Sequence, residues 1–304
     1  MAATPEILAI VGPTGTGKSE LAQQLAQRKG GVVLSADAMQ VYRELNIGTA
    51  KIPLRERRVA HYGLDIAGLA QGYSAALYQR YARGVIEDCQ ARGQTVVVCG
   101  GTGLYVRAAL DDFDFPEGAQ EDNSLRAHYE EVLAQQGADA LYAQLLERDA
   151  VSAALIHPHN SRRVIRALEL CDRGESYAQR GARFKTFQSY YPQVTWLGLQ
   201  QERAELYHRL DERVEEMLAR GMLDEVCQLR DLGLGESLTA RQAIGYKELL
   251  TYLEGECGYE QAVEIWKQNT RRYAKRQMTF FCADPRIQWI SCSLAQGSKA
   301  ERVR

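Results

Sequence analysis

The chain has 304 residues, more than the roughly 100–150 of a typical domain, so we expect one large α/β domain with an insertion, or two domains. Hydrophobic residues make up 45% and charged residues 25%, which argues against a disordered, collagenous or low-complexity chain. The formal net charge of −2 gives no general attraction to nucleic acid or to a membrane surface, so any polyanion site must come from local clusters of Lys and Arg.

Cysteine usage and hydropathy indicate the compartment. The seven cysteines include no C-x-x-C pair, so neither a disulfide framework nor a zinc site is indicated, and a reducing cytoplasm fits best. The N-terminus lacks a basic region, and no apolar run approaches the ~20 residues of a membrane span. We therefore expect a cytoplasmic protein that binds no membrane, and we expect it to be a monomer.

Hydrophobic periodicity predicts alternating strands and helices in the first third of the chain. Strands are predicted at 6–11, 32–35 and 95–99, and helices over 18–28 and 73–92. This alternation is typical of a parallel sheet covered on both faces, with ligands at the carboxyl ends of the strands.

The pattern changes between Asp111 and about Tyr191, where an acidic segment leads into helical periodicity with hardly any strand signal. We expect an α/β core formed by residues 1–111 and 192–304, and an inserted helical subdomain formed by residues 112–191. After the insertion, a strand is predicted at 194–199, a long helix near 202–220, further helices to about Phe281 and a last strand at 287–290.

Residues 12–19 (GPTGTGKS) match G-x-x-x-x-G-K-[ST] between a predicted strand and a predicted helix, which is the context that this motif requires. Its glycines let backbone N–H groups point at a phosphate, and the helix N-terminus adds partial positive charge. We expect Lys18 to reach the terminal phosphate and the Ser19 hydroxyl to ligate Mg²⁺. The fold class is therefore predicted to be a P-loop NTPase-like parallel sheet flanked by helices. The candidate diphosphate-binding residues are Gly12, Pro13, Thr14, Gly15, Thr16, Gly17, Lys18 and Ser19.

Asp37 lies two residues beyond the second predicted strand. P-loop kinases and NTPases usually hold their metal with a carboxylate after a later strand, but the strand at 95–99 leads into Gly100-Gly101-Thr102. Asp37 is thus a candidate general base acting on an acceptor, with capping of a loop or helix as the alternative.

Seven blocks spread over the chain resemble tRNA dimethylallyltransferases, and together they are far more specific than a P-loop alone. The resemblance implies transfer of a dimethylallyl group from dimethylallyl diphosphate to N6 of the adenosine at tRNA position 37, next to the anticodon, with release of diphosphate. The absence of C-terminal Cys/His pairs favours the bacterial type. The blocks are GPTGTGKS (12–19), SADAMQVYRELNIGTAK (35–51), YSA (73–75), VCGGTGLYVRAAL (98–110), IHPHNSRRVIRALE (156–169), AIGYKEL (243–249) and YAKRQMTFF (273–281).

The resemblance assigns catalytic roles to Asp37, Thr102 and Lys18, and it identifies Arg213 as the arginine that reaches the diphosphate, with Arg209 as the alternative. This agrees with the chemistry, because a carboxylate can take the proton of the exocyclic amine as the bond forms. The P-loop amides, Lys18 and Mg²⁺ would stabilise the departing diphosphate.

Contacts with the tRNA anticodon stem-loop are expected in several segments. Gln40 is expected to read adenine edges with its amide, and Gly245 to allow close approach of the RNA. The expected contacts are Asp37, Ala38, Met39, Gln40, Thr102, Arg126, Arg162, Arg163, Val164, Ile165, Arg166, Gln242, Ala243, Ile244, Gly245, Tyr246, Lys247, Lys275, Arg276 and Gln277.

Residues 266–286 carry six cations against Asp284 alone, a local charge of 6 − 1 = +5. If this segment is helical, Lys267, Arg271 and Lys275 form one basic row, beside a second row that contains Arg272 and Arg276, and a solvated face is the alternative to phosphate binding. The other side is expected to be core, and it consists of Trp266, Thr270, Tyr273, Gln277 and Phe280.

Three other functions stay open on the sequence alone. These are an adenylate isopentenyltransferase, a small-molecule P-loop kinase with ATP as donor, and a non-catalytic RNA-binding protein. The segment AHYGLDI (60–66) lacks a Pro and a His that many relatives have there, whereas Asp65 is present.

Overall fold

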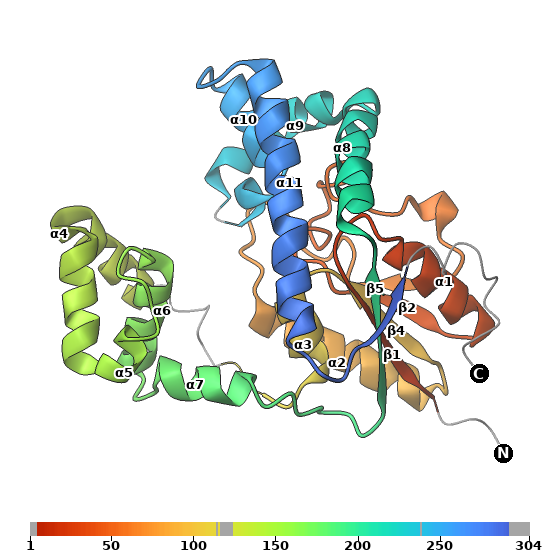
Figure 1. The fold of residues 1–304 in the computed structure, drawn as a ribbon, viewed down its shortest axis with the longest axis horizontal. Helices are drawn as coiled ribbons and strands as arrows, with labels where there is room; N and C mark the ends of the chain where they lie inside the picture. Colours follow the sequence, from red (N-terminus) through yellow and green to blue (C-terminus); the bar gives the residue numbers. More distant parts are fainter. Residues whose placement is uncertain (1–4, 114, 116–123, 238, 292–304) are drawn as a thin grey trace. The chain divides into compact units, whose positions relative to one another are not determined.

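The computed structural model of the chain describes residues 5–113, 115, 124–237 and 239–291 (Figure 1). It divides into two compact units, one formed by residues 1–110 and 191–304 and the other by residues 111–190. Each boundary lies one residue before the boundary expected from the sequence. Most of the acidic segment 111–123 lies outside the described residues. Within the described part of the chain, no helix has the length and apolar character needed to cross a membrane.

The first unit contains a six-stranded sheet. Its strands are β1 (Ile7–Val11), β2 (Val32–Ser35), β3 (His61–Tyr62), β4 (Val96–Gly100), β5 (Val194–Gln200) and β6 (Gln288–Ser291). They lie in the order β3-β2-β4-β1-β5-β6, and every neighbouring pair is parallel, which confirms the predicted parallel sheet. Five strands match the prediction to within one residue at each end. The prediction missed β3, because two residues are too few to produce a periodic pattern.

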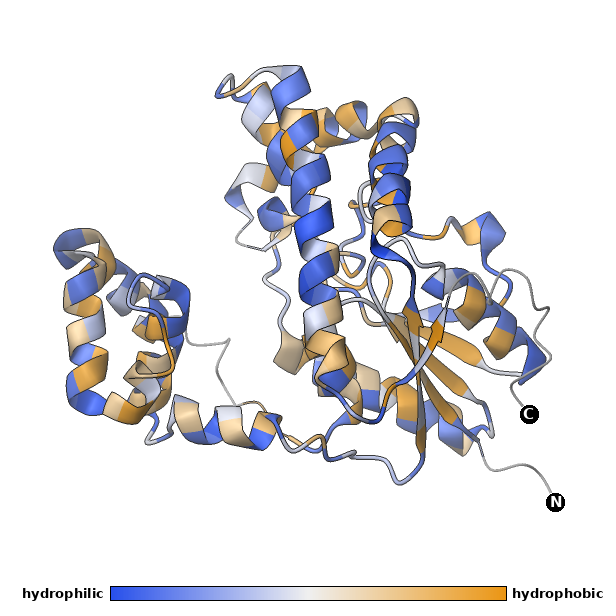
Figure 2. Ribbon diagram, viewed as in Figure 1, coloured by the Kyte–Doolittle hydropathy of each residue, from blue (hydrophilic) through white to orange (hydrophobic). Residues whose placement is uncertain are grey.

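The strands β1, β2 and β4 are buried along their whole length, which explains their continuous apolar sequences. Figure 2 shows this concentration of apolar residues in the sheet. Val11 pairs with Gly100, and Ser35 pairs with Cys99, so these three strands end at the same edge. The loops that follow them therefore lie close together.

Helices cover both faces of the sheet. They include α1 (Lys18–Arg28), α2 (Ala75–Ala91) and α3 (Gly103–Leu110), and η1 (Leu54–Glu56) lies in the loop after β2. The chain crosses from β1 to β2 through α1, and after β3 it returns to β4 through α2. Because such crossovers are right-handed, these opposite directions place α1 and α2 on opposite faces. Leu25 of α1 packs in one cluster with Leu8 and Val97 of the sheet.

The last third of the chain is mainly helical. It contains α8 (Arg203–Ala219), α9 (Met222–Asp231), η2 (Leu234–Glu236), η3 (Ala240–Gln242), α10 (Tyr246–Leu253) and α11 (Tyr259–Cys282). The helices α8 and α11 pack side by side, with Leu206 and Leu210 of α8 against Ala274 of α11 (Figure 1). This packing brings α11 to the edge of the sheet where the strands end.

The second unit has a core of its own. It consists of α4 (Ser124–Arg148), which is interrupted at Gly137, α5 (Ala150–Ala153), α6 (Ser161–Asp172) and α7 (Tyr177–Phe184). Leu141 and Leu145 of α4 pack with Val164 and Leu168 of α6. The inserted segment is thus an independently packed helical unit, as its periodicity predicts.

Candidate active site

A cavity of about 940 Å³ lies at the carboxyl ends of β1, β2 and β4. Its lining includes Lys18 and Ser19 of the P-loop, Asp37 after β2, Gly101 after β4 and one face of α8. In parallel α/β sheets, ligands bind at this edge. The structure therefore brings together candidate residues that are as far as 263 positions apart in the sequence.

The P-loop connects β1 to α1 and has a tightly constrained path. Gly12 has φ +136°, and a Cβ atom there would lie 2.4 Å from the carbonyl oxygen of Leu199 on β5. Thr16 Oγ1 and Lys18 Nζ both donate to the carbonyl oxygen of Pro13, at 2.9 Å and 2.6 Å. Lys18 thus lies over the loop that is expected to bind the phosphate. It is also the first residue of α1, a helix whose N-terminus attracts anions.

Asp37 lines the cavity and also shapes the turn that carries it. Its Oδ1 accepts the N–H groups of Met39 at 2.9 Å and Gln40 at 3.3 Å. The two roles that the sequence left open for this carboxylate are therefore compatible. Both hydrogen bonds that it accepts from the described residues use Oδ1. Oδ2 therefore remains available to take a proton from an acceptor substrate.

Two side chains of α11 line the same cavity, namely Tyr273 and Gln277. Helical spacing predicted both to be core, and the resemblance also gave Gln277 as a tRNA contact. Gln277 is buried. Gln277 accepts the Thr14 N–H at 2.9 Å and donates to the Gly101 carbonyl at 3.0 Å, so it joins the P-loop to the turn after β4. Burial and the charge of Asp37 raise the pKa of Tyr273 to about 12, while the neighbouring side chains of Thr102 and Gln277 lower it. Thr102 Oγ1 in turn accepts the N–H of Ala38 at 3.0 Å.

The arginines of α8 complete the phosphate side of the cavity. Arg213 Nη1 donates to Thr14 Oγ1 at 3.4 Å, and Arg209 Nη1 donates to the Gly15 carbonyl at 3.1 Å. Burial lowers the pKa of Arg213, and the nearby charge of Asp37 opposes this shift. The two arginines that the sequence offered as alternatives both reach the P-loop. Arg220 lines the cavity as well, and its spacing of seven from Arg213 is the signal that the sequence analysis overlooked.

Comparison with known proteins agrees with this geometry. A family model described as IPP transferase matches residues 40–284. The chain belongs to the IPP transferase family. It is 44% identical over 289 residues, which are 94% of this chain and 92% of the relative, to a protein from Syntrophus aciditrophicus named tRNA dimethylallyltransferase 2.

Solved structures of IPP transferases and related enzymes share the fold. A tRNA isopentenylpyrophosphate transferase from Bacillus halodurans is 38% identical with a TM-score of 0.69, covering 94% of this chain and 90% of that one. A eukaryotic dimethylallyltransferase, described as acting on tRNA, is 29% identical with a TM-score of 0.81, covering 98% of this chain and 76% of that one.

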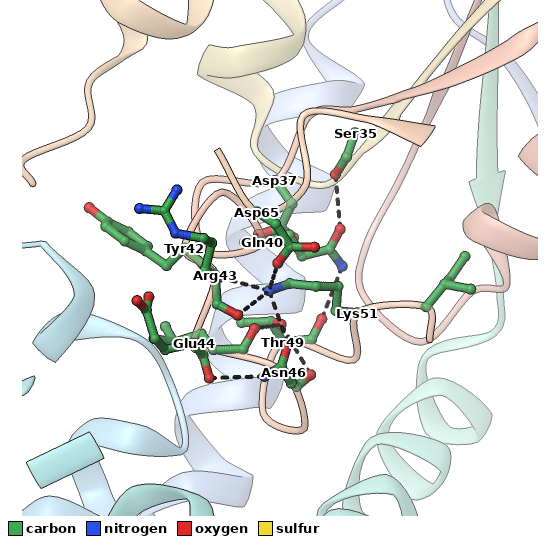
Figure 3. A network of polar contacts seen from close by, with 12 residues as sticks. Ser35, Asp37, Gln40, Tyr42, Arg43, Glu44, Asn46, Thr49, Lys51 and Asp65 are labelled. Atoms are coloured by element: carbon green, nitrogen blue, oxygen red, sulfur yellow. Dashed lines mark hydrogen bonds and ion pairs between the residues drawn. The ribbon is translucent and has the colours of Figure 1, made fainter. Parts of the chain in front are cut away.

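In this IPP transferase, each end of the Gln40 amide already makes one hydrogen bond within the protein. Its Oε1 accepts from Ser35 Oγ at 2.9 Å, and its Nε2 donates to the Thr49 carbonyl at 3.0 Å (Figure 3). Each end keeps one further hydrogen-bonding position, so the expectation that Gln40 reads adenine edges stays a prediction. Gln40 lines the cavity with Asp37.

The block 242–247 is largely interior, which contradicts the expected role of Gly245. Ala243 and Tyr246 are buried. Gly245 has φ +92°, and a Cβ atom there would lie 2.7 Å from the indole ring of Trp266, so this glycine serves close packing on α11 and not the approach of RNA. Gln242 and Ile244 are half-buried, and Lys247 is exposed.

The expected contact residues of the helical unit are of two kinds. Val164 and Ile165 are buried in its core, so their side chains cannot contact a ligand. Arg162 and Arg163 are exposed. Arg126 and Arg166 flank the buried Glu169 at 2.8 Å and 2.9 Å, and their hydrogen bonds lower the pKa of this carboxyl although burial raises it.

The basic rows predicted for α11 are only partly available. Lys267 pairs with Glu215 at 2.5 Å, and Arg271 pairs with Asp211 at 2.6 Å, so these two cations attach α11 to α8. Within the described chain, Arg272, Lys275 and Arg276 make no ion pair, and they lie with Thr279 and Phe280 around a second cavity of about 500 Å³. The available positive surface is thus the later part of the helix, not the whole row.

Proposed function

We propose that this IPP transferase moves a dimethylallyl group from dimethylallyl diphosphate to N6 of the adenosine at tRNA position 37 and releases diphosphate. The observation that carries the proposal is a single cavity that holds a P-loop and Asp37 but has no carboxylate at the end of β4. Its relatives are named tRNA dimethylallyltransferases. We further propose that it acts as a monomer in the cytoplasm, where tRNA is found.

The donor end of the cavity suits a diphosphate. The P-loop amides, Lys18 and the guanidinium groups of Arg209 and Arg213 face the position where negative charge grows as the allylic C–O bond breaks. These groups stabilise the leaving group more in the transition state than in the ground state.

Mg²⁺ fits this end of the cavity. The Ser19 hydroxyl lines it, and among the described residues no three His, Cys, Asp or Glu side chains form a metal cage. Mg²⁺ keeps several waters and takes its remaining ligands from a few protein oxygens and substrate phosphates, so one hydroxyl beside a diphosphate is a suitable donor set. When bound, the ion would neutralise charge on the diphosphate.

Asp37 serves the acceptor end. The exocyclic amine of adenine is a weak nucleophile because its lone pair is delocalised into the ring, and it must lose a proton as the new C–N bond forms. Oδ2 of Asp37 takes this proton while Oδ1 stays fixed by the turn. Thr102 holds the same turn by accepting the N–H of Ala38.

The anticodon stem-loop binds through local positive charge, because the net charge of the chain is −2. Arg272, Lys275 and Arg276 lie on one face of α11, whose Tyr273 and Gln277 reach the reaction cavity. This arrangement supports phosphate contacts beside the position that we propose for the target base. The base must leave its stack to enter the cavity.

The test mixes the purified protein with Mg²⁺, dimethylallyl diphosphate and either an unmodified anticodon stem-loop or AMP, and follows the mass of the acceptor. We expect a gain of one dimethylallyl group on the stem-loop alone. A gain on AMP would instead identify the protein as an adenylate isopentenyltransferase. No gain on either acceptor would refute prenyl transfer, and ATP consumption would then be measured.

A further inference from the structure

The loop between β2 and β3 forms one wall of the reaction cavity through Thr49 and Ala50. Immediately before these residues, the loop is docked on α9 and α10. Glu225 of α9 accepts the N–H groups of Asn46 at 3.3 Å and Ile47 at 3.0 Å. The loop therefore takes its position from a carboxylate about 180 residues further along the chain.

Tyr246, at the start of α10, is the second docking group. Its hydroxyl accepts the Gly48 N–H at 3.1 Å and donates to Glu225 at 2.5 Å. A Cβ atom on Gly48 would lie 2.5 Å from the tyrosine ring and 2.6 Å from the end of Met222, so the backbone lies directly on the ring. Tyr246 is fully buried, so the surrounding core holds its ring in place beneath the loop.

The same loop is fastened to the Asp37 turn on its other side. The Thr49 carbonyl accepts from Gln40, whose N–H is bound by Asp37 (Figure 3). Lys51 donates to the Tyr42 carbonyl at 2.7 Å and to Asp65 at 2.7 Å, which closes the loop at its base. Hydrogen bonds thus link Tyr246 to Asp37 by way of the Gly48–Thr49 backbone and Gln40.

We propose that Tyr246 and Glu225 are positioning residues, which hold the wall at Thr49–Ala50 and the Asp37 turn in the geometry that the acceptor requires. This inference rests on the proposed function and deepens it. It gives the block around Tyr246 a part in the reaction without any contact with RNA. Displacement of a reacting group by about 1 Å can cost on the order of 100-fold in rate, so loosening this dock affects transfer although no docking side chain meets a substrate.

The test compares Tyr246→Phe, Glu225→Gln and Gly48→Ala with two matched controls. Tyr81→Phe removes an equivalent hydrogen bond, because the Tyr81 hydroxyl accepts the Gly63 N–H at 3.1 Å, and Tyr81 does not line the cavity. Gly84→Ala places a methyl group where no atom lies within 4 Å. Steady-state transfer to the stem-loop, calorimetric binding of dimethylallyl diphosphate and hydrogen exchange are measured for each variant.

We expect each docking variant to lower kcat/KM for the stem-loop at least about tenfold, with donor affinity within about twofold of the wild type. We also expect amides 46–51 to exchange faster, and the controls to leave all three readouts unchanged. An equal loss in Tyr81→Phe, an equal loss of donor binding, or unchanged exchange would overturn the inference while the proposed function stands. Failure of the wild type to modify the stem-loop would refute the proposed function, and with it the positioning role, whatever the exchange data show.

Discussion

Gln277 joins three segments around the cavity, so its replacement tests how the P-loop is held. In Gln277→Ala, the buried Gly101 carbonyl loses its donor and the half-buried Thr14 N–H loses its acceptor. An unsatisfied buried group costs about 1–3 kcal/mol, whereas a group that water can reach loses only the net value of its bond, about 0.5–1.5 kcal/mol. We therefore expect the free energy of unfolding to fall by roughly 1.5–4.5 kcal/mol.

Tryptophan fluorescence during denaturant unfolding isolates the relevant unit. All three tryptophans of the chain, Trp196, Trp266 and Trp289, belong to the unit that contains the sheet, so the helical unit does not contribute to the signal. Gln268→Ala is the matched control, because this glutamine lies exposed on the same helix. Surface substitutions of this kind usually change stability by less than about 0.5 kcal/mol.

The reasoning also predicts weaker donor binding, because Gln277 fixes the Thr14 backbone of the P-loop. Calorimetry with dimethylallyl diphosphate should show lower affinity for Gln277→Ala and an unchanged affinity for Gln268→Ala. A loss of stability below about 0.5 kcal/mol for Gln277→Ala, or one equal to that of the control, would refute the view that its two hydrogen bonds hold the loop.

Three further predictions concern the acceptor side and the helical unit. Asp37→Asn keeps an oxygen for the turn but removes the base, so transfer should fall at least about 100-fold while calorimetric donor binding persists; substantial residual turnover would exclude Asp37 as the base. Replacing Lys275 and Arg276 together with Gln should raise the KM for the stem-loop and reduce the slope of log K against log salt by roughly 1.5–2, and an unchanged slope would contradict phosphate contacts. Because the pKa of Glu169 is lowered from about 4.5, its contribution to stability is present above that pH and is lost as pH falls through the lower folded value. Glu169→Gln should therefore speed hydrogen exchange in α6 at pH 7, and equal exchange in both proteins would show that the two arginine pairs contribute nothing.

Local patterns were sufficient to predict the sheet and the phosphate-binding loop. The strand β4 is apolar throughout because both of its faces are buried, and Lys18–Arg28 follows a motif whose glycines and lysine lie within eight residues. Such features depend on neighbours in the sequence, so a single chain displays them directly. The two-residue strand β3 has too little pattern of this kind.

The parts that the sequence could not predict depend on distant contacts. Helical spacing assigned Gln277 to the core, yet its partner Thr14 is 263 residues away. Counting charge along α11 likewise overestimated the available basic surface, because the acidic partners of Lys267 and Arg271 lie on α8. Periodicity shows which face of a helix is apolar, but it does not show which other element that face meets.

The two ends of the inserted helical unit are joined to each other. Asp111 forms an isolated antiparallel bridge with Ser189, and the Asp112 N–H donates to the Gln188 carbonyl at 2.9 Å. The entropy of closing a loop depends on the separation of its ends, and here the insert itself holds its ends together. For the entropy of loop closure, residues 111–190 therefore resemble one short connection between α3 and β5. A designer could exchange this unit for a tight turn, or for a different module with neighbouring termini, without lengthening the path that the core must close.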